Sequence, residues 1–177
     1  MCGIFGKIGS VELTKVEDCV LSMGRKLFHR GPDDHGIYKD SFGNDQMIGL
    51  GHHRLRIIDL SENARQPMCN EDGSVWIVFN GEIYNFKPLR QELIQKGHRF
   101  RSKSDTEVIL HLYEEEGLQS IERLAGMFAF ALWDSRKERL WLCRDRLGIK
   151  PLVYFWDGKS LSFASEIKAI LADPTID

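Results

Sequence analysis

The hydrophobic pattern changes period along this chain, and the change limits the folds available to it. Residues 87–96 and 104–116 carry apolar side chains at helical spacing. Four short apolar segments joined by polar turns follow, at 127–133, 139–143, 154–156 and 160–164. Such segments are typical of strands in antiparallel hairpins. Helices and strands therefore occur in blocks rather than as alternating βα units, which predicts an α+β fold with antiparallel sheets.

The remaining segments predict a similar mixture. Strands are expected at 3–8, 36–38, 47–52 and 75–79, and further helices at 14–29 and 165–171. Ser104 and Glu107 match a capping box at the start of the 104–116 helix, as Thr14 and Glu17 do for the 14–29 helix. The chain has 177 residues and no internal repeat or linker, so we expect one domain over residues 1–177.

Composition excludes several classes of function. Hydrophobic residues make up 42% and charged residues 28%, which argues against disorder, and a net charge of −2 provides no basic surface for nucleic acid. No stretch approaches the roughly 20 apolar residues of a membrane span, and the start does not resemble a signal peptide. The 4 cysteines show no CxxC pair or disulfide spacing, so we expect a reduced, cytoplasmic protein without a membrane partner.

The chain begins MCGIFG, and Cys2 is its first candidate for chemistry. Removal of Met1 would give Cys2 a free α-amino group beside its thiol. A thiol needs a base to form the nucleophilic thiolate, and an α-amine with a pKa of about 7.7–8.0 suits that task near neutral pH. Position alone leaves two other interpretations open, a small buried apolar residue or an exposed thiol without function.

The segment VFNGEIYNF permits two interpretations. Asn-Gly between apolar strand residues is a strong hairpin signal, so this stretch alone favours Asn80 and Gly81 as a turn. Alternatively, the side-chain amide of Asn80 and the backbone N–H of Gly81 converge on one oxygen and form an oxyanion hole.

Two charged residues offer contacts to a substrate. Arg54, in GHHRLRIIDLS, either pairs with a surface carboxylate or holds a substrate carboxylate through two hydrogen bonds. Asp105, in RSKSDTEVIL, lies in the first turn of a predicted helix. Its negative charge either interacts favourably with the helix dipole or binds a substrate ammonium group.

The loops also hold histidines and aspartates, residue types that can bind a metal ion: His29, Asp33, Asp34, His35, His52 and His53. Neither HxxxH nor HExxH spacing is present, and loop residues of these types are usually solvated. We therefore expect no metal site.

These segments together resemble one known family. The sequence is similar to the glutaminase domain of class II glutamine amidotransferases with an N-terminal cysteine nucleophile, and within them to the glutamine-hydrolysing asparagine synthetases. The resemblance runs from Met1 to about Leu171 and is carried by MCGIFG, HRGPDDHG, GHHRLRIIDLS, QPM, NGEIYN, SDTEVIL, LAGMFAFALWD, RDRLGIKPL and FASEIKAI. NGEIYN together with RDRLGIKPL indicates the asparagine synthetase branch.

The resemblance implies an Ntn-hydrolase fold, a four-layer α/β/β/α sandwich of two antiparallel sheets. It also implies hydrolysis of glutamine to glutamate and ammonia. Cys2 would attack the side-chain amide carbon and form a thioester, while Asn80 and Gly81 stabilise the oxyanion. Arg54 would hold the α-carboxylate of glutamine, and Asp105 would address its α-amino group.

Further roles follow from the same resemblance. Glu82 would assist Asp105 at the α-amino group, and Arg30 would lie behind the nucleophile. The backbone of the segment after Arg54 would touch the substrate, through Leu55, Arg56, Ile57 and Ile58.

The chain departs from the family in two ways. Arg56 stands where the family often has a small residue, and strand alternation places it on the face of Arg54, where it would crowd the pocket or alter its charge. The family's second domain uses ATP and Mg to activate a carboxylate and receives the ammonia, and nothing in this sequence resembles it. We therefore expect no cofactor in this domain and a separate synthetase domain or subunit as its partner.

Two other functions stay open at this point. One is a non-catalytic glutamine-binding or regulatory domain, and the other is a metal-dependent hydrolase built on the loop histidines. The carboxylate that would accept the ammonia, whether aspartate or another, is open as well.

Overall fold

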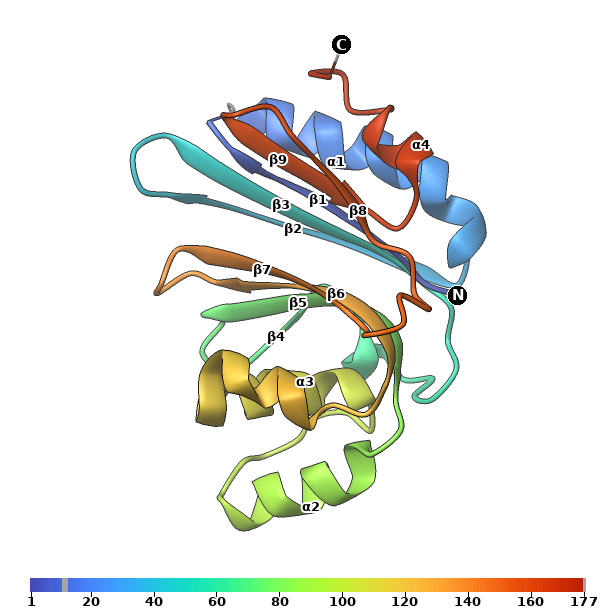
Figure 1. Ribbon diagram of the computed structural model, residues 1–177, viewed down its shortest axis with the longest axis vertical. Coiled ribbons are helices and arrows are strands. Elements are labelled where there is room, and N and C mark those ends of the chain that lie inside the picture. Colours follow the sequence, from blue (N-terminus) through green and yellow to red (C-terminus); the bar gives the residue numbers. More distant parts are fainter. Residues whose placement is uncertain (11–12, 177) are drawn as a thin grey trace.

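Two antiparallel sheets lie face to face in this protein (Figure 1). The computed structural model describes residues 1–10 and 13–176. The first sheet contains, in spatial order, β2 (Asp34–Phe42), β3 (Gln46–Arg54), β1 (Gly3–Gly9), β9 (Ser160–Ala164) and β8 (Val153–Trp156). The second sheet contains β4 (Met68–Cys69), β5 (Val75–Ile83), β6 (Gly126–Asp134) and β7 (Arg139–Arg144).

Helices form the two outer layers (Figure 1). α1 (Leu13–Leu27) and the short α4 (Ile167–Ile170) cover the first sheet, and α2 (Phe86–Gln95) and α3 (Asp105–Glu116) lie outside the second. Short 3₁₀ turns occupy Phe28–Arg30, Glu62–Ala64 and Gly117–Arg123. The order helix, sheet, sheet, helix confirms the predicted α/β/β/α sandwich.

Alternation along β5 divides the interior into separate cores. Val78 packs between the two sheets, whereas Ile77 and Phe79 pack between the second sheet and its helices. A third core lies under α1 and α4 and includes Val20 and Leu27. The two sheets are therefore packed against each other and against the helices through three hydrophobic cores.

The predicted turn at Asn80 and Gly81 is wrong. Asn80 pairs with Ala129 and Gly81 with Phe128 on β6, so both residues lie within the ladder of β5. A Cβ atom added to Gly81 would lie 2.7 Å from the Cα of Phe128. The close approach of strand β6 therefore explains the glycine, and no turn is involved.

The other predicted elements occur with shifted ends. The helix predicted at 14–29 ends at Leu27 and continues as a 3₁₀ turn, and the strand predicted at 36–38 is the longer β2. Strand β4 was not predicted, because two residues are too few to show a period. The predicted capping contact of Thr14 with Glu17 involves the side chain of Thr14, which lies outside the part of the chain whose side chains are described.

Helix α3 begins, as predicted, at an N-cap serine. The Oγ atom of Ser104 accepts a hydrogen bond from the backbone N–H of Thr106 at 3.1 Å. The reciprocal half of the predicted capping box is wrong. The carboxylate of Glu107 instead accepts from the backbone N–H groups of Arg101 at 2.7 Å and Ser102 at 2.8 Å. Glu107 therefore fixes the segment that leads into the helix.

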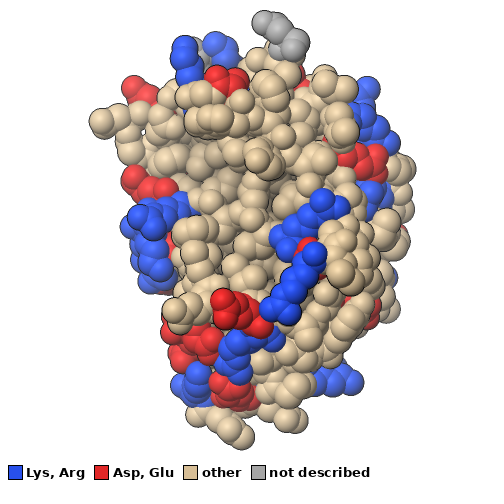
Figure 2. Space-filling model, viewed as in Figure 1, with Lys and Arg blue, Asp and Glu red and all other residues tan. Residues whose placement is uncertain are grey.

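The surface is unevenly charged. Figure 2 shows charged side chains at the top, along the sides and at the lower end of the molecule, whereas the upper centre of the face carries no charge. Within the described ranges, none of the helices has the length and apolar character that a membrane span requires.

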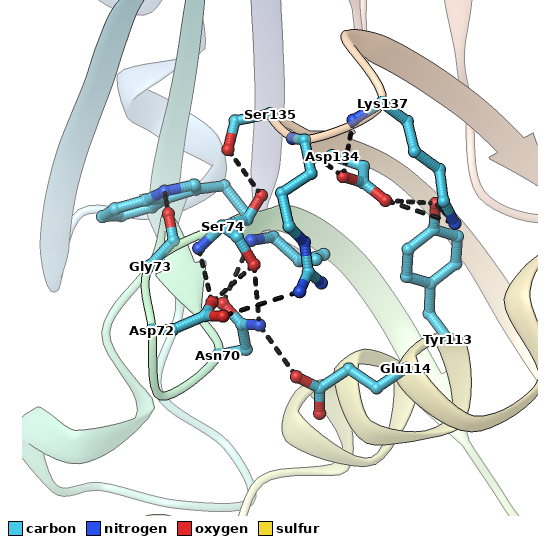
Figure 3. A network of polar contacts seen from close by, with 12 residues as sticks. Asn70, Asp72, Gly73, Ser74, Tyr113, Glu114, Asp134, Ser135 and Lys137 are labelled. Carbon is cyan, nitrogen blue, oxygen red and sulfur yellow. Dashed lines mark hydrogen bonds and ion pairs between the residues drawn. The ribbon is translucent and has the colours of Figure 1, made fainter.

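Tyr113 joins helix α3 to the end of β6 (Figure 3). Its hydroxyl donates to Oδ2 of Asp134 at 2.9 Å, and Asp134 is 1% exposed. Tyr113→Phe removes this bond from a buried carboxylate, so we expect the free energy of unfolding in urea to fall by about 1.5–3 kcal/mol. Tyr84→Phe is the matched control, because Tyr84 is 62% exposed, and should change stability by less than about 0.5 kcal/mol. Equal losses in the two variants would contradict this role.

Candidate active site

A pocket opens where the start of β1, the ends of β3 and β5 and the start of α3 meet. These elements are far apart in the sequence, so only the complete sandwich assembles the pocket. The predicted site residues that line it are Cys2, Arg54, Leu55, Ile57, Ile58, Gly81 and Asp105. Arg30, Arg56, Asn80 and Glu82 are described but do not line it.

Cys2 lies directly before β1 and faces the first residue after β3. The backbone N–H of Leu55 donates to the Cys2 Sγ atom at 3.4 Å, and Sγ lies 3.7 Å from the carbonyl oxygen of Leu55. Burial raises the pKa of the Cys2 thiol, although the Leu55 hydrogen bond, the amino terminus, Arg54 and Arg30 act in the opposite direction. The thiol is therefore mostly protonated at neutral pH, and nucleophilic attack needs a base.

Arg30 supports the backbone of the candidate nucleophile. Its Nε atom donates to the carbonyl oxygen of Cys2 at 2.9 Å, and its Nη1 atom donates to Glu166 at 2.8 Å. Burial opposes ionisation of Glu166, but hydrogen bonds from Arg30 and Lys168 lower the pKa of this carboxyl group to about 2. Arg30 thus links the start of the chain to the segment before α4 without entering the pocket.

Arg54 organises the loop 55–61, which forms one wall of the pocket. Arg54 is 5% exposed, and its guanidinium donates to the carbonyl oxygens of Asp59 and, at 3.0 Å, Ser61. The Asp59 carboxylate accepts from the backbone N–H of Lys103 at 2.7 Å. Burial by itself would raise the pKa of Asp59, but the hydrogen bonds from Lys103 and Ser61 lower it below its usual value. The loop is therefore fixed both to β3 and to the segment before α3.

The prediction that Arg56 shares a strand face with Arg54 is wrong, because β3 ends at Arg54. The backbone N–H of Arg56 donates to Asp33 at 2.9 Å, and its guanidinium donates to Glu62 at 2.7 Å. The charge of Arg56 is therefore paired with a carboxylate outside the pocket.

Asn80 provides a buried donor next to the pocket. It is 2% exposed, and its Nδ2 atom has no hydrogen-bond partner among the described residues. A buried polar group left unpaired costs about 1–3 kcal/mol, so this amide gains most from an oxygen atom brought by a ligand. Gly81 follows on the same strand and lines the pocket. The two residues can thus present neighbouring N–H groups.

Asp105, at the start of α3, adds a buried carboxylate to the pocket lining. It is 4% exposed, and Oδ2 accepts from the backbone N–H of Ile83 at 2.9 Å. Burial raises the pKa of Asp105, and the nearby negative charge of Glu82 adds to this effect. A positively charged group entering the pocket would relieve both penalties.

Several pocket residues were not predicted. Asp59, Gln66, Ser104 and Thr106 also line it. The Oε1 atom of Gln66 accepts from the backbone N–H of Phe79 at 2.6 Å, and Nε2 donates to Thr106 at 3.3 Å. Gln66 belongs to the QPM segment that contributes to the family resemblance, and that segment was the sequence feature from which a role of Gln66 in the pocket could have been predicted.

The prediction that the histidines considered as metal ligands lie in solvated loops is wrong for His35, which lies on β2, and for His52 and His53, which lie buried on β3. The histidines also point to different partners. Nε2 of His52 lies 3.1 Å from the carbonyl oxygen of Phe79, and Nε2 of His53 lies 2.8 Å from that of Gly24. His29 lies 3.0 Å from Glu166. Burial lowers the pKa of His52 to about 3, so its ring is neutral. These rings bond to separate parts of the structure.

Solved structures share this fold. A glutamine phosphoribosylpyrophosphate amidotransferase from B. subtilis superposes with a TM-score of 0.75 at 24% identity, over 97% of this chain and 43% of that chain. A structure described as the allosteric regulatory enzyme of purine biosynthesis superposes with a TM-score of 0.76 at 22% identity, with the same coverage. The predicted amidotransferase fold is confirmed.

Sequence relatives are more specific. Asparagine synthetase [glutamine-hydrolyzing] 3 of Bacillus subtilis is 43% identical over 99% of this chain and 28% of its own length. Asparagine synthetase [glutamine-hydrolyzing] 2 of Arabidopsis thaliana is 45% identical over 98% of this chain and 29% of its own length. This chain therefore spans less than a third of these relatives. The family model described as a glutamine amidotransferase domain matches residues 1–177. The chain thus belongs to the glutamine amidotransferase domain family and is homologous to the glutamine-hydrolysing part of asparagine synthetases.

Proposed function

We propose that this chain hydrolyses the side-chain amide of glutamine to glutamate and ammonia, with Cys2 as the nucleophile. The observation that carries the proposal is that Cys2, Arg54 and Asp105 line one pocket. These opposite charges match the carboxylate and ammonium groups of an amino acid.

In this proposal the reaction is acyl transfer through a thioester. Once Met1 is removed, the α-amine of Cys2 takes the proton of its own thiol, and the thiolate attacks the amide carbon. Asn80 and Gly81 donate to the oxyanion of the tetrahedral intermediate. The amine returns the proton to the departing ammonia, and water then releases glutamate from the thioester. Met1 is 56% exposed, which is consistent with its removal.

The test uses purified protein whose first residue is checked by intact mass spectrometry. Glutamate and ammonia are measured after glutamine is added, with and without a chelator. Release of both products in equal amounts, unaffected by the chelator, is expected of protein that begins at Cys2. Glutamine binding without product release would instead indicate the regulatory alternative, and loss of activity with the chelator would indicate a metal-dependent hydrolase.

Arg54→Lys is expected to weaken substrate binding. The ammonium group of a lysine cannot replace the several fixed N–H donors by which the guanidinium binds the loop carbonyls and a substrate carboxylate together. The KM for glutamine should therefore rise about 10–100-fold, with a smaller change in kcat. Arg56→Lys is the matched control, because Arg56 binds Glu62 outside the pocket. Its KM should stay within about twofold of the parent value. Similar KM increases in both variants would count against the assigned role of Arg54.

We also infer that the ammonia passes to an ATP-dependent synthetase domain or subunit. The relatives named above are asparagine synthetases more than three times longer than the part that this chain matches. The turn after β7 supports the inference, because Leu147 and Ile149 are 86% and 53% exposed. Nζ of Lys150, in the same turn, lies 3.6 Å from Sδ of Met1. An exposed apolar turn beside the nucleophile is suited to covering by a partner.

A further inference from the structure

A cluster of metal-binding side chains lies in the helical layer, outside the proposed active site. His98 follows α2, and His111 and Glu114 lie on α3. The Nδ1 atoms of His98 and His111 are 3.1 Å apart, and Oε2 of Glu114 lies 2.8 Å from Nδ1 of His111 and 3.7 Å from Nδ1 of His98. Three atoms, each of which can act as a metal ligand when unprotonated, thus lie close together.

These distances match the coordination geometry of zinc. Nitrogen and oxygen ligands bind Zn²⁺ at about 2.0–2.1 Å in a tetrahedron, which places neighbouring ligand atoms about 3.3–3.4 Å apart. The three distances in the cluster scatter around that value. One ion therefore reaches all three atoms if the side chains shift by a few tenths of an ångström.

The three cluster atoms share a single proton. Nε2 of His98 lies 3.0 Å from Oε1 of Glu115 and carries a proton toward it, which leaves Nδ1 of His98 as an acceptor. His111 then has one Nδ1–H group for two acceptors, Nδ1 of His98 and the carboxylate of Glu114. A divalent ion in place of that proton engages all three atoms.

Two neighbours hold the ligands in orientation. The Glu115 carboxylate accepts from His98, which is the usual arrangement behind a metal-bound imidazole. Nδ2 of Asn70 donates to Oε1 of Glu114 at 2.8 Å, so that Oε2 is left for the cluster (Figure 3). Asn70 comes from the segment before β5, and the site therefore has support from the sheet as well as from α3.

The surroundings allow an ion to enter. The side chains of His98 and Glu114 are 15% and 20% exposed, whereas that of His111 is 2% exposed. Glu107 lies 3.9 Å from Nε2 of His111 and adds negative charge on the buried side. The cluster is thus fixed at its base and reaches solvent at its edge, where water can supply a fourth ligand.

We propose that Nδ1 of His98, Nδ1 of His111 and Oε2 of Glu114 bind one divalent transition-metal ion, with Zn²⁺ as the best match to the ligand set. The ion fastens the segment after α2 to α3, the helix whose first residue is Asp105. It contributes no step to glutamine hydrolysis, and the proposal does not depend on the function proposed above.

The test measures Zn²⁺ binding by titration calorimetry on chelator-treated, dialysed protein. The Cys2→Ser variant serves as the parent, because the Cys2 thiol is itself a possible zinc ligand. We expect one Zn²⁺ per chain, and Co²⁺ in its place should give the visible spectrum of a tetrahedral complex. Adding His98→Gln, which keeps a polar side chain near Glu115, should weaken binding by at least about 100-fold.

Matched variants separate the site from general effects. His35→Gln removes an exposed histidine elsewhere and should bind Zn²⁺ like the parent. Glu115→Gln should weaken binding about 10–100-fold while every ligand is kept. Circular dichroism of each variant checks that the fold is retained. No 1:1 binding by the parent, or binding by the His98→Gln protein as tight as that of the parent, would overturn the proposal.

Discussion

Cys2→Ala should reduce glutamate release from glutamine by about 10⁴-fold or more. Alanine removes the sulfur on which the thioester forms, and no other thiol lines the pocket among the described residues. The Sγ atom makes only weak polar contacts with Leu55, so the free energy of unfolding should change little. The measurement is steady-state glutamate release, with urea denaturation of the same protein to exclude unfolding.

Cys69→Ala is the matched control for this prediction. Cys69 is also a partly buried free thiol, but it lies on β4 and not in the pocket. Its loss should leave glutamate release unchanged. Activity of the parent should also follow the fraction of chains that begin at Cys2, as measured by mass spectrometry. Turnover that persists in Cys2→Ala, or that is full in chains retaining Met1, would rule out the proposed nucleophile.

Much of the layered fold could be predicted because the local pattern and the tertiary structure agree. The strands of the last third are short, mainly apolar segments separated by polar segments, among them the turn at Asp157-Gly158. Ser104 caps α3 by accepting a hydrogen bond from Thr106, only two residues further along the chain, and a contact between such near neighbours can be predicted from a sequence pattern. Local signals of this kind do not depend on the rest of the chain.

Local signals failed where distant segments decide the conformation. Asn80-Gly81 has the sequence of a hairpin turn, but pairing with β6 keeps it extended. Arg56 leaves the face of Arg54 because β3 ends where the 31–33 segment bonds to it, through the backbone N–H of Asp33 and the carbonyl oxygen of Arg54 at 3.1 Å. A strand end that is set by a distant segment cannot be predicted from the residues of the strand alone.

The metal-binding cluster shows the same limitation. His111 and Glu114 are three residues apart on one helix, a spacing that is common on helix surfaces. Their partner His98 precedes the helix in an irregular segment, and only the packing of α2 against α3 brings its ring to 3.1 Å from that of His111. No HxxxH pattern could therefore have indicated the site, and the histidines that the sequence analysis considered as ligands, at 29, 35, 52 and 53, are not part of it.

Asn80→Ala should lower kcat about 10²–10³-fold, which corresponds to about 2.7–4 kcal/mol of transition-state stabilisation, with little change in KM. The reason is that Nδ2 of Asn80 is a buried donor without a partner in the free protein. An oxyanion formed at the amide carbon would be its first strong acceptor. The same fact predicts that alanine does not destabilise the fold, because it removes an unsatisfied polar group and no existing Nδ2 hydrogen bond.

This pairing of lost activity with retained stability is the informative result. A structural asparagine would lose both together, so urea denaturation and kinetics must be measured on the same preparation. Asn44→Ala, at an exposed position in the β2–β3 turn, is the control and should change neither quantity. If Asn80→Ala lowers the free energy of unfolding by more than about 1 kcal/mol while kcat stays within tenfold of the parent value, Asn80 stabilises the strand and another donor must hold the oxyanion.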